Sequence, residues 1–119
     1  MRMYTLPVTT DTAGAGTSAL EAVPGGGTLY AVQLIDGDFA DGVDITLTAE
    51  IDGLSIPLLT KADFNTDQIV YPRVLQALNT DGTALTTHCE PLVMGRVKAV
   101  VAQGGSVKSG SFRLFVRDI

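Results

Sequence analysis

The stretch from Arg96 to Arg117, RVKAVVAQGGSVKSGSFRLFVR, carries the clearest fold signal in the chain. Apolar and polar residues alternate on both sides of a Gly/Ser-rich connection, and a period of two is typical of half-buried strands. One side of the two runs holds Val93, Val97, Ala99 and Val101, then Phe112, Leu114 and Val116. The other side holds Arg96, Lys98, Arg113 and Arg117. We therefore predict one β-hairpin with a buried apolar face and a basic outer face.

Upstream segments repeat this strand pattern. Residues 43–51 alternate cleanly, and Asp52-Gly53 is a strong signal for a two-residue hairpin turn. Residues 54–60 would be the partner strand, with Pro57 marking it as a sheet edge. Residues 28–35 are apolar on both faces, as in a strand covered on two sides. The core is predicted to hold Val43, Ile45, Leu47, Ile51, Val97, Val101, Phe112 and Leu114.

No segment has the period of a long amphipathic helix. Short strands separated by Gly- and Asp-containing turns predict an all-β fold, an antiparallel β-sandwich of the jelly-roll or Greek-key kind with seven to nine strands. Residues 62–67 and 80–87 are predicted to be loops. Residues 67–78 are ambiguous, because Ile69, Val70 and Tyr71 favour a strand while residues 74–78 could form a helical turn.

The first 27 residues differ from the rest. They contain Pro7, Pro24 and many Gly and Ala residues around a weak strand pattern. We predict an N-terminal extended arm or strand segment over residues 1–27 and a β-sandwich domain over residues 28–119. Apolar groups such as Met3, Tyr4 and Leu6 would gain by docking on a neighbouring subunit.

The charge of the chain is unevenly distributed. The formal net charge of 119 residues is −5. Residues 1–90 hold three basic and twelve acidic side chains, whereas residues 91–119 hold five basic side chains and Asp118. A net acidic chain does not suit nucleic acid as the main partner, but polarised charge suits docking on another protein. No apolar run approaches the length of a membrane span, and no signal-peptide pattern is present, so neither membrane insertion nor export is predicted.

Carboxylates gather in one segment, where Asp36, Asp38, Asp41 and Asp44 lie within nine residues. Two interpretations stay open. Asp and Gly favour turn conformations, and clustered oxygen ligands also suit Ca²⁺. The spacing does not fit an EF-hand loop, because Ala40 and Leu47 occupy ligand positions.

No motif indicates catalysis. His88 and Cys89 are adjacent, so on a strand they would face opposite sides, and they are too few for a zinc site. A single cysteine excludes an intrachain disulfide. Gly104 and Gly105 lack the spacing of a phosphate-binding loop. We predict a protein that is not an enzyme and needs no cofactor.

The last predicted strand places Phe115 between Arg113 and Arg117. An aromatic residue among arginines is common at protein interfaces, although a second buried face would give the same pattern. The interface candidates are Met3, Tyr4, Leu6, Arg113, Phe115 and Arg117.

Three parts of the chain resemble a known group. They are the segment from Tyr30 to Asp44, YAVQLIDGDFADGVD, the triplet Tyr71-Pro72-Arg73, and the final hairpin with its VAQGG sequence. Together they are similar to small structural proteins encoded beside the major capsid gene of tailed bacteriophages. The resemblance covers roughly residues 28–119, the span over which the strand pattern holds.

The resemblance implies a capsid decoration or cement protein. It would bind the major capsid protein at the capsid surface of the virion, often as a homotrimer, after synthesis in the host cytoplasm. It implies no site residues. The alternatives are a head–tail connector, tail or fibre component, or a carbohydrate- or calcium-binding β-sandwich module. A low aromatic content of 6 % and the absence of Trp weigh against a carbohydrate site.

Overall fold

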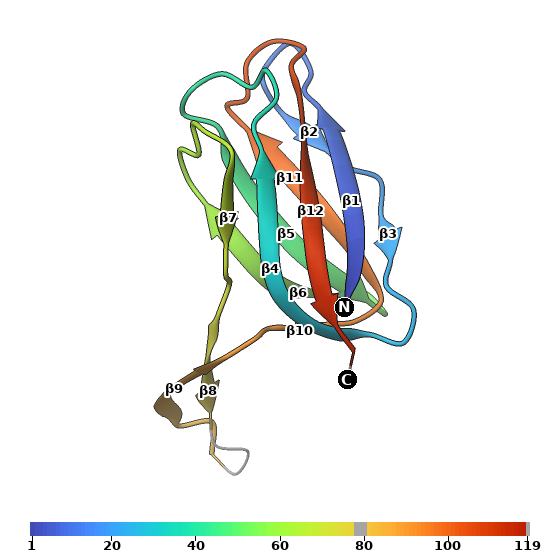
Figure 1. Cartoon of the computed structure of the whole chain (residues 1–119), viewed down its shortest axis with the longest axis vertical. Coiled ribbons are helices and arrows are strands. Elements are labelled where there is room, and N and C mark those ends of the chain that lie inside the picture. Colours follow the sequence, from blue (N-terminus) through green and yellow to red (C-terminus); the bar gives the residue numbers. More distant parts are fainter. Residues whose placement is uncertain (78–80, 119) are drawn as a thin grey trace.

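The computed structural model describes residues 1–77 and 81–118. These residues form strands without any helix, which confirms the predicted all-β fold (Figure 1). The described strands are β1 (Arg2–Thr9), β2 (Gly16–Thr17), β3 (Glu21–Ala22), β4 (Gly27–Ile35), β5 (Asp44–Ile51), β6 (Leu54–Lys61), β7 (Gln68–Val70), β8 (Val74–Ala77), β9 (Ala84–Cys89), β10 (Leu92–Val93), β11 (Arg96–Ala102) and β12 (Ser109–Arg117). Their number exceeds the seven to nine predicted because several are only two residues long.

Two antiparallel sheets pack face to face. Sheet A has the order β1-β12-β4, and β7 and β10 pair with the remaining edge of β4. In sheet B, β2 and β3 share one edge of β11, followed by β5 and β6. The pairs are nested along the chain, because β1 pairs with β12, β2 and β3 with β11, β4 with β7, and β5 with β6. Such a folded-over long hairpin has the topology of a jelly roll.

The predicted hairpin between the last two strands is wrong. β11 lies in sheet B and β12 in sheet A, so the connection over residues 103–108 crosses from one sheet to the other. Alternation identified the buried face of each strand correctly, and the two faces meet across the core. Each of the two strands instead forms a long pairing with another strand. β12 pairs with all of β1, and β11 pairs with β5 from Arg96 to Ala102.

The N-terminal segment belongs to the sandwich. β1 pairs with β12 from Arg2 to Thr9, and its side chains Leu6 and Val8 are buried in the core. Residues 2–9 are therefore a strand of the sandwich itself. β1 is tolerated as an edge strand despite Pro7, because a residue without an N–H can face outward at a sheet edge.

The core fills the space between the sheets. Of the predicted core residues, all are buried except Ile51, which is half-buried beside the turn that ends β5. The aromatic side chains Phe39, Phe64 and Phe112 meet at one end of the core, with ring centroids 5.8–6.4 Å apart. Phe39 and Phe64 come from segments that the sequence marks as turn and loop.

Two local predictions are confirmed. Asp52 and Gly53 join β5 and β6 with φ angles of 49° and 81°, the left-handed geometry of a tight hairpin turn. β6, which contains Pro57, forms one edge of sheet B. The loop predicted for residues 80–87 is only partly met, because β9 begins at Ala84 and Thr80 lies outside the described residues. The ambiguous segment 67–78 forms β7 and β8, and Leu78 also lies outside the described residues.

Candidate functional site

A two-stranded hairpin, β8–β9, projects beyond the end of the sandwich (Figure 1). Among the described residues, its strands pair only with each other, and β9 is exposed from Ala84 to His88. The apolar side chains Val74, Leu75 and Leu85 are 38 %, 53 % and 38 % exposed. An isolated hairpin is only marginally stable in water, and exposed apolar groups on a projecting element are typical of a contact surface.

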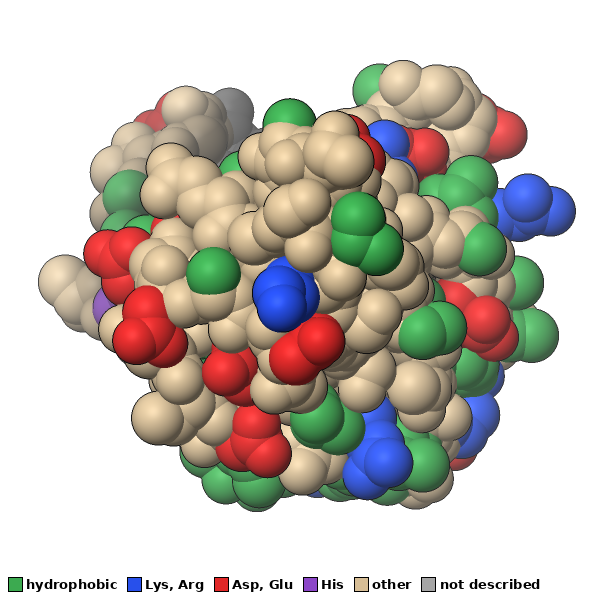
Figure 2. Space-filling view, turned by 90° about the horizontal axis from the view of Figure 1, so that it is seen from above, with side chains coloured by type: hydrophobic (Ala, Val, Ile, Leu, Met, Phe, Trp, Pro, Cys, Tyr) green, Lys and Arg blue, Asp and Glu red, His purple; other side chains and the backbone are tan. Residues whose placement is uncertain are grey.

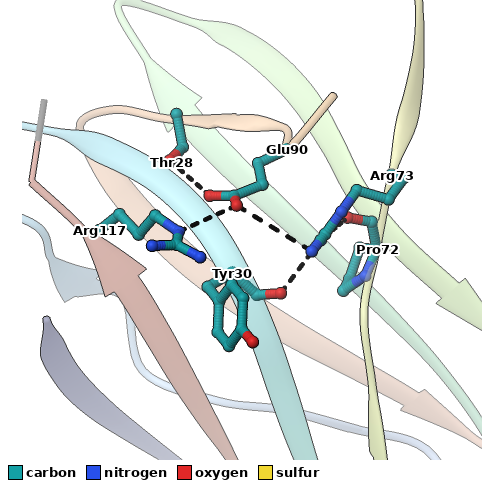
Figure 3. Close-up of polar contacts among 6 residues, drawn as sticks. All are labelled: Thr28, Tyr30, Pro72, Arg73, Glu90 and Arg117. Atoms are coloured by element: carbon teal, nitrogen blue, oxygen red, sulfur yellow. Dashed lines mark hydrogen bonds and ion pairs between the residues drawn. The ribbon is translucent and has the colours of Figure 1, made fainter. Parts of the chain in front are cut away.

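Polar contacts hold the base of this hairpin against sheet A (Figure 3). Arg73, just before β8, donates from Nη1 to the carbonyl oxygen of Tyr30 at 3.0 Å. Glu90, just after β9, accepts from Thr28 Oγ1 at 2.8 Å and from Arg117 Nε at 2.9 Å. Its second carboxylate oxygen also lies 4.0 Å from Arg73 Nη2. We call these four residues and Tyr30 the base clamp, because they fix both ends of the hairpin to one sheet.

The electrostatics of the base clamp favour an ionised Glu90. The hydrogen bond from Thr28 is the main cause that lowers the pKa of Glu90, and the hydrogen bond and positive charge of Arg117 add to it. The Arg117 guanidinium lies 4.3 Å from the centroid of the Tyr30 ring, within cation–π range. Tyr30 in turn meets Tyr71 edge-to-face at 5.7 Å. The clamp therefore connects the hairpin to an aromatic surface on the same sheet.

That aromatic surface is part of an apolar patch on the outer face of sheet A. Met3 is opposite Phe115, and Phe115 is opposite Ala31, so the three residues form a row across β1, β12 and β4. The outer-face patch consists of Met1, Met3, Tyr30, Ala31, Ile69, Tyr71 and Phe115. All but Met3 line a shallow hollow of about 170 Å³. Met3, Ile69 and Tyr71 are each more than half exposed.

The structure divides the predicted interface residues into two groups. Met3 and Phe115 lie in the outer-face patch. Arg113 is exposed on β12, the strand of Phe115, and Arg117 belongs to the base clamp. Leu6 is 1 % exposed and Tyr4 packs against the core, so neither shares the outer face of Met3. The correction follows from β1 being a sheet strand, because alternate side chains must face opposite sides.

The predicted single basic face is also corrected. Because β11 and β12 lie in opposite sheets, Arg96 and Lys98 are separated from Arg113 and Arg117 by the core. Lys98 Nζ is 2.6 Å from a carboxylate oxygen of Glu50, and Arg117 pairs with Glu90.

Sequence reasoning missed the hairpin and the tyrosines of the patch. The sequence signals for them were Tyr30, at the start of the quoted segment to Asp44, and the triplet Tyr71-Pro72-Arg73. The triplet joins the outer-face patch to the base clamp.

The Asp-rich segment lies at the end of the sandwich seen in Figure 2, where acidic side chains group together. Asp38 Oδ1 accepts from the Ser109 amide at 2.6 Å, and Asp44 Oδ1 accepts from the Asp63 amide at 3.0 Å. Burial, followed by repulsion from nearby carboxylates, raises the pKa of Asp36. Within the described part of the chain, no three His, Cys, Asp or Glu side chains are grouped so that they could hold a metal ion. Asp38 and Asp44 thus act as hydrogen-bond acceptors that connect loops.

The His88-Cys89 pair is on β9, with His88 exposed and Cys89 half-buried with a free thiol. In residues 1–77 and 81–118, no helix has the length and apolar character needed to cross a membrane. Comparison of the chain with protein-family models, with curated proteins and with solved structures finds no match.

Proposed function

We propose that this chain is a non-enzymatic structural protein of a tailed-phage virion, which decorates and stabilises the capsid shell by binding the major capsid protein. The observation that carries the proposal is the pair of apolar surfaces that its own fold leaves uncovered. These surfaces are the β8–β9 hairpin and the outer-face patch.

Both surfaces have the properties of contact regions. Monomeric proteins rarely expose large contiguous apolar patches, and aromatic and Arg residues are enriched at interfaces. The base clamp fixes both ends of the hairpin to sheet A before any partner binds, which lowers the entropic cost of binding. The jelly-roll core carries these elements on a rigid support.

The role in a virion is supported by the resemblance of residues 28–119 to small proteins encoded beside the major capsid gene. A shell protein needs a stable core and surfaces for self-association and lattice binding, and no catalytic centre. A homotrimer would match the three-fold positions of an icosahedral lattice.

Counting this chain in purified particles tests the proposal. Phage particles released from cells that carry this gene would be purified, and quantitative mass spectrometry would compare this chain with the major capsid protein. A decoration protein should be present at hundreds of copies per particle, whereas a connector ring would hold about six to twelve. A low copy number would support the connector alternative, and absence from washed particles would overturn the virion role.

A further inference from the structure

We propose that the β8–β9 hairpin of one copy of this chain packs on the outer-face patch of a second copy, so that copies join head to tail. The inference rests on the proposed structural role and names the two surfaces through which the protein would self-associate.

The hairpin needs cover that its own chain does not provide. Val74 and Leu85 are each 38 % exposed, and they share one face of the hairpin, because Val74 is opposite Cys89 and Leu85 lies four residues from Cys89 on the same strand. Among the described residues, the hairpin pairs with no strand of either sheet. The base clamp holds residues 73 and 90 against sheet A while the strands between them extend past the end of the sandwich (Figure 1). The hairpin therefore leaves the patch of its own chain open, with Tyr71 55 % exposed.

The outer-face patch offers a surface of matching character. It is hollowed, its lining is apolar and aromatic, and its row of residues crosses β1, β12 and β4. An apolar strand pair that packs across such a face would bury side chains on both partners. An isolated hairpin is marginally stable because it has no such surface to pack against.

Charge complementarity favours a second copy as the occupant. Arg113 is exposed on β12, two residues from Phe115, and no carboxylate in the described part of the chain lies within 4.0 Å of it. Residues 74–89 contain Asp81 and no Lys or Arg. The hairpin thus brings an apolar surface with one negative charge to an apolar surface flanked by a positive one, and each chain supplies both halves.

The symmetry of the contact follows from its two unlike surfaces. A contact between different patches on identical chains is heterologous, and it closes into a ring when the rotation allows. We therefore expect a closed ring, with a trimer as the size that suits the proposed lattice position.

The first test removes the apolar character of the hairpin. The full-length chain and the variant Val74→Ser/Leu85→Ser would be compared by sedimentation velocity, with thermal melting as a folding check. A matched control is Leu54→Ser, which changes a 67 % exposed leucine at the start of β6 in the other sheet, outside both proposed surfaces. The wild type and the control should sediment as one oligomer, while the hairpin variant should fall to the 12.4 kDa monomer with an unchanged melting profile.

The second test exchanges the two charges. Arg113→Asp and Asp81→Arg should each shift the equilibrium towards monomer, and the double variant should restore the oligomer. A wild type that is monomeric at every concentration, or an oligomer that survives the hairpin variant, would overturn the inference. Particle binding by a monomer would overturn this inference while leaving the proposed function intact. If the protein forms a hairpin-dependent oligomer but is absent from particles, the proposed function would be overturned and this inference would remain.

Discussion

Phe64 provides the sharpest check on how the core is built. It is in the segment between β6 and β7, where no regular strand forms, yet its side chain is fully buried against Phe39 and Phe112. Its amide donates to the carbonyl oxygen of Val43 at 3.1 Å, which holds the segment beside the start of β5. Truncation to Ala would leave a cavity that the two rigid sheets cannot close.

The expected loss for Phe64→Ala is about 3–5 kcal/mol, the range for buried Phe-to-Ala changes. A chain of this length loses roughly 4 °C in Tm per kcal/mol, so the melting temperature should fall by about 12–20 °C. Thermal melting followed by circular dichroism and urea unfolding would measure both quantities. Thr66→Ala, an exposed change in the same segment, is the control and should be close to neutral. A fall of less than about 2 °C, the size of a surface effect, would refute the assignment of Phe64 to the core.

Four further outcomes are expected. Leu6→Ala should destabilise the fold by about 2–5 kcal/mol in urea unfolding, whereas a detachable arm would leave stability unchanged. Val107 has φ of 51°, unfavourable for a β-branched residue, so Val107→Asn should raise stability by about 1 kcal/mol, and a lower Tm would contradict this. Because the pKa of Asp36 is raised, its contribution to stability is fully present below 3.8 and lost as pH rises through the raised value; Asp36→Asn should therefore increase Tm at neutral pH but not near pH 3. The pKa of Glu90 is lowered, so its contribution is present above 4.5 and lost as pH falls through the lowered value; Glu90→Gln should speed amide exchange in the hairpin at neutral pH, and equal exchange there would argue against the base clamp.

The sequence predicted local structure well where one face of a strand is buried. In residues 43–51 and 96–117, alternation identified the inward side chains, because a strand side chain can face only the core or the solvent. Asp52-Gly53 likewise located a hairpin turn, since both residues accept positive φ at low cost.

The candidate site was harder to predict from the sequence. Phe115 was correctly placed on an outward face, but its neighbours in the patch come from three other strands and the segment after β7. Glu90 and Arg73 are 17 residues apart and meet only because the hairpin returns the chain to sheet A. A pattern of residue types along the chain cannot identify neighbours that are so far apart in the sequence.

What the sequence determined by itself is the class of fold and the buried face of its longest strands, because these depend on the local period of apolar residues. Tertiary structure alone decided that β11 and β12 belong to opposite sheets, that β1 closes sheet A, and that Phe39 and Phe64 enter the core from irregular segments. The reason is that each strand pairs with whichever strand edge in the whole molecule gives the best match in length and packing. Nested pairing joins β1 to β12 across nearly the whole chain, and only the folded molecule brings those edges together.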